Sequence, residues 1–127
     1  MTVSTIERAQ MRDHVNRAQP VDYVTELLLC PRRIEDAEKE VAGCSDRLRT
    51  AQERLEDEEA RLLSDGSIDA KNKEGRDAQM RLATSPLREE VRRLERLLED
   101  RKITLRREQN RFSAFRSVAR YLAREEE

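Results

Sequence analysis

Residues 23–62 read YVTELLLCPRRIEDAEKEVAGCSDRLRTAQERLEDEEARL, and residues 87–122 read LREEVRRLERLLEDRKITLRREQNRFSAFRSVARYL. In both stretches, mostly apolar or small residues recur at alternating steps of three and four. In the first they are Tyr23, Leu27, Cys30, Ile34, Ala37, Val41, Cys44, Leu48, Ala51, Leu55, Glu58 and Leu62. In the second they are Leu87, Val91, Leu94, Leu98, Arg101, Leu105, Glu108, Phe112, Phe115, Ala119 and Leu122. A mean step of about 3.5 residues keeps one stripe of a helix, here called the seam, facing a partner helix.

The two seams fit each other when the chain folds back after Leu62. If residues whose numbers add up to 149 face each other, Leu62 meets Leu87 next to the tip. Further along the seam, small residues then face large ones, as Ala37 faces Phe112. We therefore predict an all-α fold, a long antiparallel coiled-coil helical hairpin. A short tip helix and an N-terminal helical arm complete the prediction.

Local signals divide the chain. Residues 1–20 form an N-terminal arm or short helix, residues 21–124 a single helical-hairpin domain, and residues 125–127 an acidic tail. Within the domain we expect one arm over 21–63, a tip over 64–85 and a second arm over 86–124. Pro31 interrupts the first arm, but the seam keeps its phase across this residue, which favours a kinked helix over two separate ones.

The ends of the arms carry helix stop and start signals. Gly66 suits the left-handed residue that follows a helix, and Ser85-Pro86 is typical of a helix start with Ser85 as the N-cap. Between them, Asp69 is expected to cap a short helix over residues 70–83.

Composition narrows the functional classes. Charged residues make up 42% of the 127 residues and aromatic residues only 3%, so a thick globular core is not expected. A thin hairpin offers no concave pocket in which to shift a pKa or exclude water, so we predict that the protein is not an enzyme and uses no cofactor or metal.

The cysteines and the hydropathy pattern bear on location. Cys30 and Cys44 both fall in the seam, where we interpret them as small core residues kept reduced in the cytoplasm. The chain has no apolar run near the roughly 18 residues of a membrane span, and its N-terminus does not resemble a signal peptide. A cytoplasmic protein with no membrane partner is expected.

Basic residues gather in the second arm. Residues 31–63 carry a net charge of −3, whereas residues 86–124 carry +6. The peak, here called the basic run, consists of Arg101, Lys102, Arg106, Arg107, Arg111, Arg116, Arg120 and Arg124, against one acid, Glu108. Such a helix can lie along a phosphate backbone, so these residues (Arg124 apart) are candidate contacts for DNA or a partner. The alternative is a solvated face balanced by acids of the other arm or of a second copy.

Apolar residues outside the seam point to self-association. Leu28, Leu63, Leu97 and Val118 lie beside the seam and would stay wet in a single hairpin, so a homodimer or higher homo-oligomer is expected. Three seam positions are polar, namely Glu58, Arg101 and Glu108. They fit either register-setting contacts or long side chains that reach water at the seam's edge.

The tip carries a sequence motif. Residues 66–80, GSIDAKNKEGRDAQM, resemble the G-x-x-x-G-K-N-x-x-x-R-x-x-Q-L tip of small helical proteins of phages and prophages, with Ala70 where that pattern often has Gly and Gly75 where an acid is usual. The similarity extends over residues 50–122 and includes the run Arg111-Phe112-Ser113-Ala114-Phe115-Arg116. The tip candidates are Lys71, Asn72, Arg76 and Gln79. They either form a contact surface or bond the free amides and carbonyls at the helix ends.

The resemblance suggests a role, because such proteins tend to be encoded near phage replication and recombination genes. We expect an accessory protein that acts in DNA replication or recombination by contact with a partner protein, and through DNA where the basic run binds it. The partner would be a phage replication or recombination protein or a host protein. Two alternatives remain: a structural, virion-type coiled-coil component, or a small inhibitor of a host protein.

Overall fold

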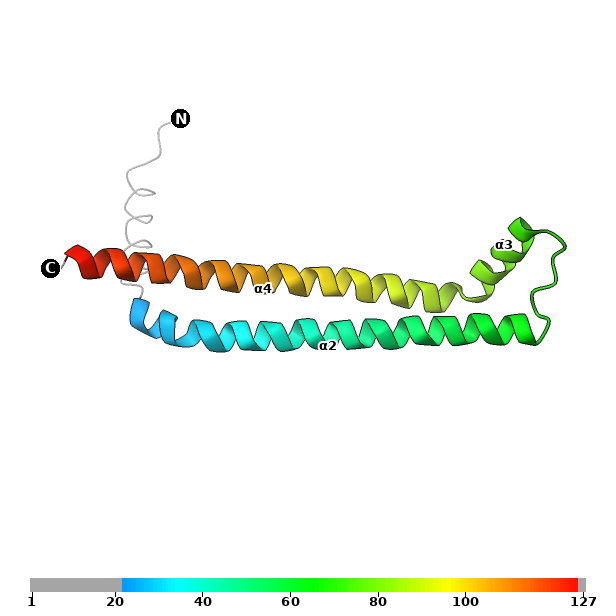
Figure 1. Ribbon diagram of the computed structural model, residues 1–127, viewed down its shortest axis with the longest axis horizontal. Helices are drawn as coiled ribbons and strands as arrows, with labels where there is room; N and C mark the ends of the chain where they lie inside the picture. Colours follow the sequence, from blue (N-terminus) through cyan, green and yellow to red (C-terminus); the bar gives the residue numbers. More distant parts are fainter. Residues whose placement is uncertain (1–21, 126–127) are drawn as a thin grey trace, which may run out of the picture.

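The computed structural model describes residues 22–125, which form three helices. They are α2 (Tyr23–Ser64), α3 (Lys73–Ala83) and α4 (Ser85–Glu125). The two long helices lie antiparallel and side by side, and α3 with the loop before it joins them at one end (Figure 1). The predicted all-α helical hairpin with a tip helix is confirmed. The arm predicted for residues 1–20 and the last two residues of the acidic tail lie outside the described residues.

Helix α2 begins at an Asp cap and runs through its proline. The Asp22 carboxylate accepts the backbone N–H of Thr25 at 3.2 Å, which satisfies one of the unpaired amides of the first turn. Pro31 lies inside the helix and removes one backbone hydrogen bond. The first turns of α2 are tilted relative to the rest (Figure 1), so Pro31 coincides with a bend and does not end the helix.

The predicted seam faces the other arm along almost its whole length. On α2 every seam residue is buried or half-buried, and four of the five most buried follow one another at seven-residue intervals: Cys30, Ala37, Cys44 and Ala51. On α4 only Arg101 and Leu122 of the seam are exposed. Cys30 and Cys44 are free thiols.

The alignment of the two arms differs from the predicted one. Among residues 22–125, the ion pairs that join the arms have residue numbers that add up to 147, 141 and 137: Glu59–Arg88, Glu40–Arg101 and Glu26–Arg111. The ring of Tyr23 packs edge-on against that of Phe115, with centroids 5.8 Å apart, where the predicted alignment places Ile34 opposite Phe115. The constant sum of 149 is therefore wrong, and the observed sums bracket a value one heptad lower.

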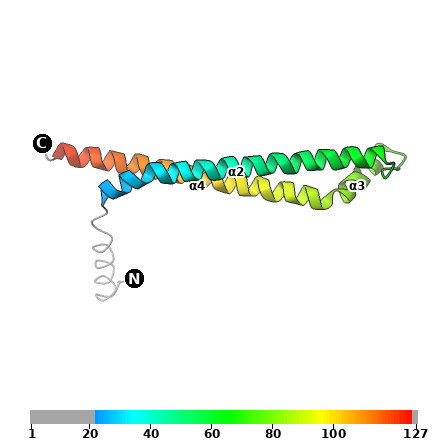
Figure 2. The ribbon, with the colours of Figure 1, turned by 90° about the horizontal axis from the view of Figure 1, so that it is seen from below.

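Heptad periodicity explains this error. A seam that repeats every seven residues matches its partner equally well when the alignment is moved by seven, so the pattern alone does not choose between these alignments. The structure takes the alignment with the lower sum of facing residue numbers. Helix α4 consequently extends beyond the start of α2 (Figure 2). Leu122, which was expected to meet Leu27, is exposed for this reason.

The best-packed layer lies towards the tip. Ala51, Val91 and Leu94 form the buried cluster, and Leu48, Leu55 and Leu97 pack against it. Leu97 is therefore half-buried, and the expectation that it stays wet is wrong. Leu28, Leu63 and Val118 are exposed as expected.

Two predicted helix caps are also wrong. The N-cap of α3 is Asn72, three residues later than Asp69. Only Thr84 separates α3 from α4, and its carbonyl accepts the backbone N–H of Arg88 at 2.9 Å. Thr84 therefore performs the capping role expected of Ser85. Pro86 still lies in the first turn of α4, where a missing N–H costs nothing.

The buried cluster predicts that Leu94 is the side chain of α4 whose truncation lowers the free energy of unfolding most. Leu94 is 3% exposed, so the Leu94→Ala variant should lower the free energy of unfolding by about 2–5 kcal/mol. Leu82→Ala provides the control, because Leu82 is 78% exposed and its truncation should cost less than about 0.5 kcal/mol. Chemical denaturation followed by circular dichroism measures both. Equal effects of the two changes would contradict the observed packing.

Candidate nucleic-acid interface

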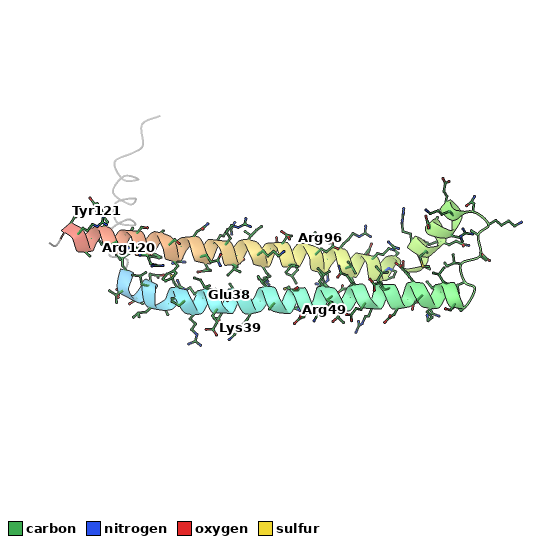
Figure 3. All side chains as sticks on the ribbon, in the orientation of Figure 1. Glu38, Lys39, Arg49, Arg96, Arg120 and Tyr121 are labelled. Atoms are coloured by element: carbon green, nitrogen blue, oxygen red, sulfur yellow. The ribbon has the colours of Figure 1, made fainter. Side chains whose placement is uncertain are left out.

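The basic run lies on the second half of α4, near the open end of the hairpin. Its eight side chains are exposed and come from several faces of the helix, because successive members advance by one, four or five positions. In Figure 3, Arg120 lies near the C-terminal end of α4. Arg96 lies closer to the tip, on the side of α4 that faces away from α2.

Three members of the basic run have carboxylate partners. Arg101 lies 3.9 Å from Glu40 of α2, Lys102 lies 3.5 Å from Glu99, and Arg111 lies 3.1 Å from Glu26. Glu26 also accepts a hydrogen bond from Arg33 at 2.8 Å, which raises the pKa of the Arg33 guanidinium. Part of the basic run thus joins the two arms, as the alternative reading of its charge expected.

Two arginines lie over the phenylalanine rings of the seam. The guanidinium carbon of Arg111 is 5.6 Å from the ring centroid of Phe115, and that of Arg116 is 5.5 Å from the centroid of Phe112. Such cation–π contacts limit the freedom of the side chains while leaving their N–H groups able to bind an anion. The ring therefore holds Arg116 in place, and no carboxylate among the described residues neutralises its charge.

Arg106, Arg107 and Arg120 have no ion-pair partner among the described residues. Arg106 and Arg120 are fourteen residues apart, which corresponds to about 21 Å along the helix axis. Together with Arg116 they place several uncompensated positive charges along one helix. This arrangement can neutralise phosphates of a nucleic acid.

At the tip, two of the four candidate residues are used internally. The Asn72 side chain accepts the backbone N–H of Gly75 at 2.7 Å and so caps α3. The Gln79 side-chain oxygen accepts the backbone N–H groups of Asp69 and Ala70 at 3.0 and 2.9 Å, and its amide donates to the Asp69 carboxylate at 2.7 Å. Asn72 and Gln79 therefore bond free backbone groups, as one of the two interpretations expected, although they do so within the tip.

The other two candidates, Lys71 and Arg76, are exposed. Arg76 follows Gly75, where a Cβ atom would come within 2.9 Å of the Ala70 Cβ and 2.8 Å of the Asn72 side-chain oxygen. Glycine at this position thus gives room to the methyl group of Ala70.

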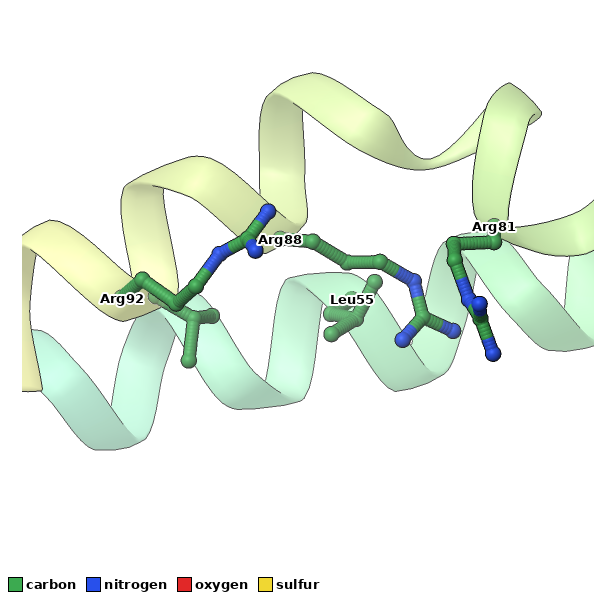
Figure 4. Close-up of a pocket in the computed structure, with 5 residues that line it drawn as sticks. Leu55, Arg81, Arg88 and Arg92 are labelled. Carbon is green, nitrogen blue, oxygen red and sulfur yellow. The ribbon is translucent and has the colours of Figure 1, made fainter.

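Three further arginines, absent from the sequence-based candidates, gather where α3 meets α4. Arg81, Arg88 and Arg92 line a surface hollow of about 400 Å³ together with Leu55 and Val91. Figure 4 shows Arg81 and Arg88 reaching over α2, with Leu55 beneath Arg88, and the guanidinium of Arg92 lying beside α4. Their spacing of seven and four residues was a signal in the sequence. Its meaning depends, however, on how α3 turns into α4, which the pattern does not show.

Carboxylates near the tip are held ionised by their neighbours. Hydrogen bonds from the side chain and backbone of Ser67 lower the pKa of Asp65, and the Arg93 guanidinium lowers that of Glu90. Both groups are exposed, so these shifts reflect local pairing and not an enclosed, pKa-tuned site.

Residues 22–125 hold neither a cluster of metal-ligating side chains nor a membrane-spanning helix. Residues 22–125 contain no group of three or more His, Cys, Asp or Glu side chains placed to hold a metal ion. None of the described helices combines the length and the apolar composition needed to cross a membrane.

The chain matches no protein-family model, and neither curated proteins nor solved structures show significant similarity to it.

The steric relation between Ala70 and Gly75 predicts a compensating pair of substitutions. Gly75→Ala should destabilise the tip by about 1–3 kcal/mol, because the added methyl group overpacks against Ala70. Adding Ala70→Gly should recover part of this loss. Amide hydrogen exchange of α3 residues measures the local stability in both variants. If Gly75→Ala alone slows exchange, as its helix propensity would favour, the close approach is wrong.

Proposed function

We propose that this protein is a non-enzymatic accessory protein of phage type, which acts in DNA replication or recombination by binding DNA through the basic run. The observation that carries the proposal of DNA binding is that five of the eight members of the basic run have no carboxylate partner among the described residues, namely Arg106, Arg107, Arg116, Arg120 and Arg124. Like charges that repel one another along one helix are stabilised when an anion binds them. A polyphosphate backbone supplies anions at a regular spacing.

The geometry favours contact with the backbone of DNA over reading of its bases. Phe112 and Phe115 are half-buried in the seam, where they pack beneath arginines, so these rings are not free to stack on bases. Binding should therefore depend mainly on charge and only weakly on sequence.

Salt dependence tests this proposal. With four phosphate contacts, the logarithm of affinity for single-stranded DNA should fall against log salt with a slope near −3, at roughly 0.7 per contact. Arg106→Gln with Arg107→Gln should flatten the slope by about one to two units and leave the helix content unchanged, since Gln is a comparable helix former. Fluorescence anisotropy with a labelled oligonucleotide measures the slope.

Two further variants sharpen the test. Arg54→Gln with Arg96→Gln removes the same two charges from exposed positions outside the basic run and should change the slope much less. Glu26→Gln frees Arg111 from its carboxylate and should strengthen binding. Absence of binding to single-stranded and duplex DNA at about 50 mM salt would contradict the proposal.

A second candidate function, a structural or assembly component, is favoured by exposed apolar side chains on both arms. Leu28 and Leu63 are 75% and 62% exposed near the two ends of α2, and Val118 of α4 is 36% exposed. These apolar side chains would be covered if two hairpins associated. A homodimer is compatible with either function.

The exposed side chains of Leu28 and Leu63 predict a measurable self-association. Light scattering should return a mass of twice 14.9 kDa at high protein concentration. Leu28→Gln with Leu63→Gln should shift the equilibrium towards the monomer without loss of helix content, because neither side chain contributes to the buried cluster. A single species of 14.9 kDa for the unmodified chain would exclude the dimer.

A further inference from the structure

The hollow at the junction of α3 and α4 has the features of a binding surface. Arg81, Arg88 and Arg92 form its rim, and Leu55 and Val91 form its apolar floor (Figure 4). We call this surface the tip hollow. It lies at the closed end of the hairpin, away from the basic run at the open end.

One of the three guanidinium groups is held in a fixed position. The Nε of Arg88 donates to the Thr84 hydroxyl at 2.9 Å, and one of its terminal nitrogens donates to the Glu59 carboxylate at 3.0 Å. Thr84 is fully buried and donates in turn to the Met80 carbonyl at 2.7 Å. Arg88 is thus oriented by α2, α3 and α4 before any ligand binds, and it retains N–H groups that can donate to an anion.

The charge of the tip hollow is not balanced locally. Within the described part of the chain, Arg81 and Arg92 have no ion-pair partner, and Arg88 has only Glu59. Arg88 also lies in the first turn of α4, where no acidic residue is present and the helix dipole already contributes positive charge. Arg81, in the last turn of α3, and Arg92, in the second turn of α4, lie close to Arg88, and an anion bound between the three cations would reduce their mutual repulsion.

Apolar side chains continue from the tip hollow into a second hollow beside it. This second hollow, of about 340 Å³, shares Arg81 and Arg88 and is lined by Leu63, Ile68 and Met80, and also by the charged side chains of Glu59, Arg76 and Asp77. Leu63, on its edge, is largely exposed. Carboxylates on the arginines and an apolar side chain against Leu63 and Met80 could therefore be bound at the same time.

We propose that the tip hollow binds an acidic peptide segment of a partner protein, one that carries carboxylates beside a large apolar side chain. This inference rests on the accessory role proposed above, but not on DNA binding by the basic run. Charge complementarity selects an acidic ligand, and the apolar floor distinguishes a peptide from a nucleic acid. A phosphate backbone would leave Leu55, Val91 and Met80 without a complementary group, and the tip hollow and its neighbour present no aromatic ring for base stacking.

The test uses a labelled synthetic peptide in which pairs of glutamates alternate with leucine, and fluorescence anisotropy on the full chain. Arg81→Gln with Arg92→Gln should weaken binding roughly tenfold, since two charge-assisted contacts are lost. Both side chains are exposed, so the fold should persist. Arg96→Gln, which removes one positive charge from an exposed position outside the tip hollow, is the control and should change the affinity less than about twofold. Glutamine in place of the peptide's glutamates, or serine in place of its leucines, should each abolish most of the binding.

Several results would overturn the proposal. The first is no peptide binding at millimolar concentration. The second is that the peptide without glutamates, or the peptide without leucines, binds as tightly as the original peptide. The third is an equal loss of peptide affinity in the Arg81/Arg92 and Arg96 variants. A further one is loss of oligonucleotide binding in the Arg81/Arg92 variant with peptide binding unchanged, which would assign the tip hollow to DNA. Failure of DNA binding through Arg106 and Arg107 remains a separate result, because those variants leave the tip hollow intact.

Discussion

The hairpin depends on the close approach that small residues allow between its two long helices. Cys30, Ala37, Cys44 and Ala51 occupy one position in four successive heptads of α2, and all four are buried. A larger side chain at any of them would push α4 away or force a strained rotamer, at a cost of about 1–3 kcal/mol. The pairs at the edges of the seam, such as Glu26 with Arg111, require this short separation. These exposed pairs select the arrangement more than they stabilise it.

The tip depends on hydrogen bonds where the arms depend on packing. Asn72 caps α3, Gln79 holds the preceding loop, and Thr84 joins α3 to α4 within a single residue. This short junction fixes the direction in which α3 leaves α4. Arg81 consequently lies beside Arg88 and Arg92, although a helix boundary separates it from them. The local chemistry of the tip therefore determines a charged surface that neither helix forms alone.

The sequence predicts the helices well and their alignment poorly, for a physical reason. Seam burial requires only that apolar residues recur every three or four positions, so nearly every seam residue, from Tyr23 to Ala119, was identified correctly. Alignments one heptad apart bury the same stripe, so features outside the seam must choose between them. The ion pairs at the seam's edges and the tip, with its buried Thr84 and the hydrogen bonds of Gln79, are such features, and a periodic pattern does not contain them. The tip hollow was missed for the same reason, since it exists only once α3 is oriented. The basic run was visible as a local excess of arginine. Its division into paired and unpaired members required the actual alignment, which brings Glu26 to Arg111.

The two arginine-rich surfaces share helix α4, and their separation has a consequence for binding. Arg92 of the tip hollow and Arg106, the first member of the basic run without a carboxylate partner among the described residues, are fourteen residues apart, which places them about 21 Å apart along the axis. This distance is more than twice the Debye length of about 8 Å at physiological salt, so a ligand at one surface would change the electrostatic potential at the other only slightly. An acidic peptide at the tip hollow and a nucleic acid at the basic run would therefore not compete through charge, even though both are anions. A long thin hairpin achieves this separation with few residues. A compact domain of the same size would bring the two surfaces closer together, and one ligand would then screen the site of the other.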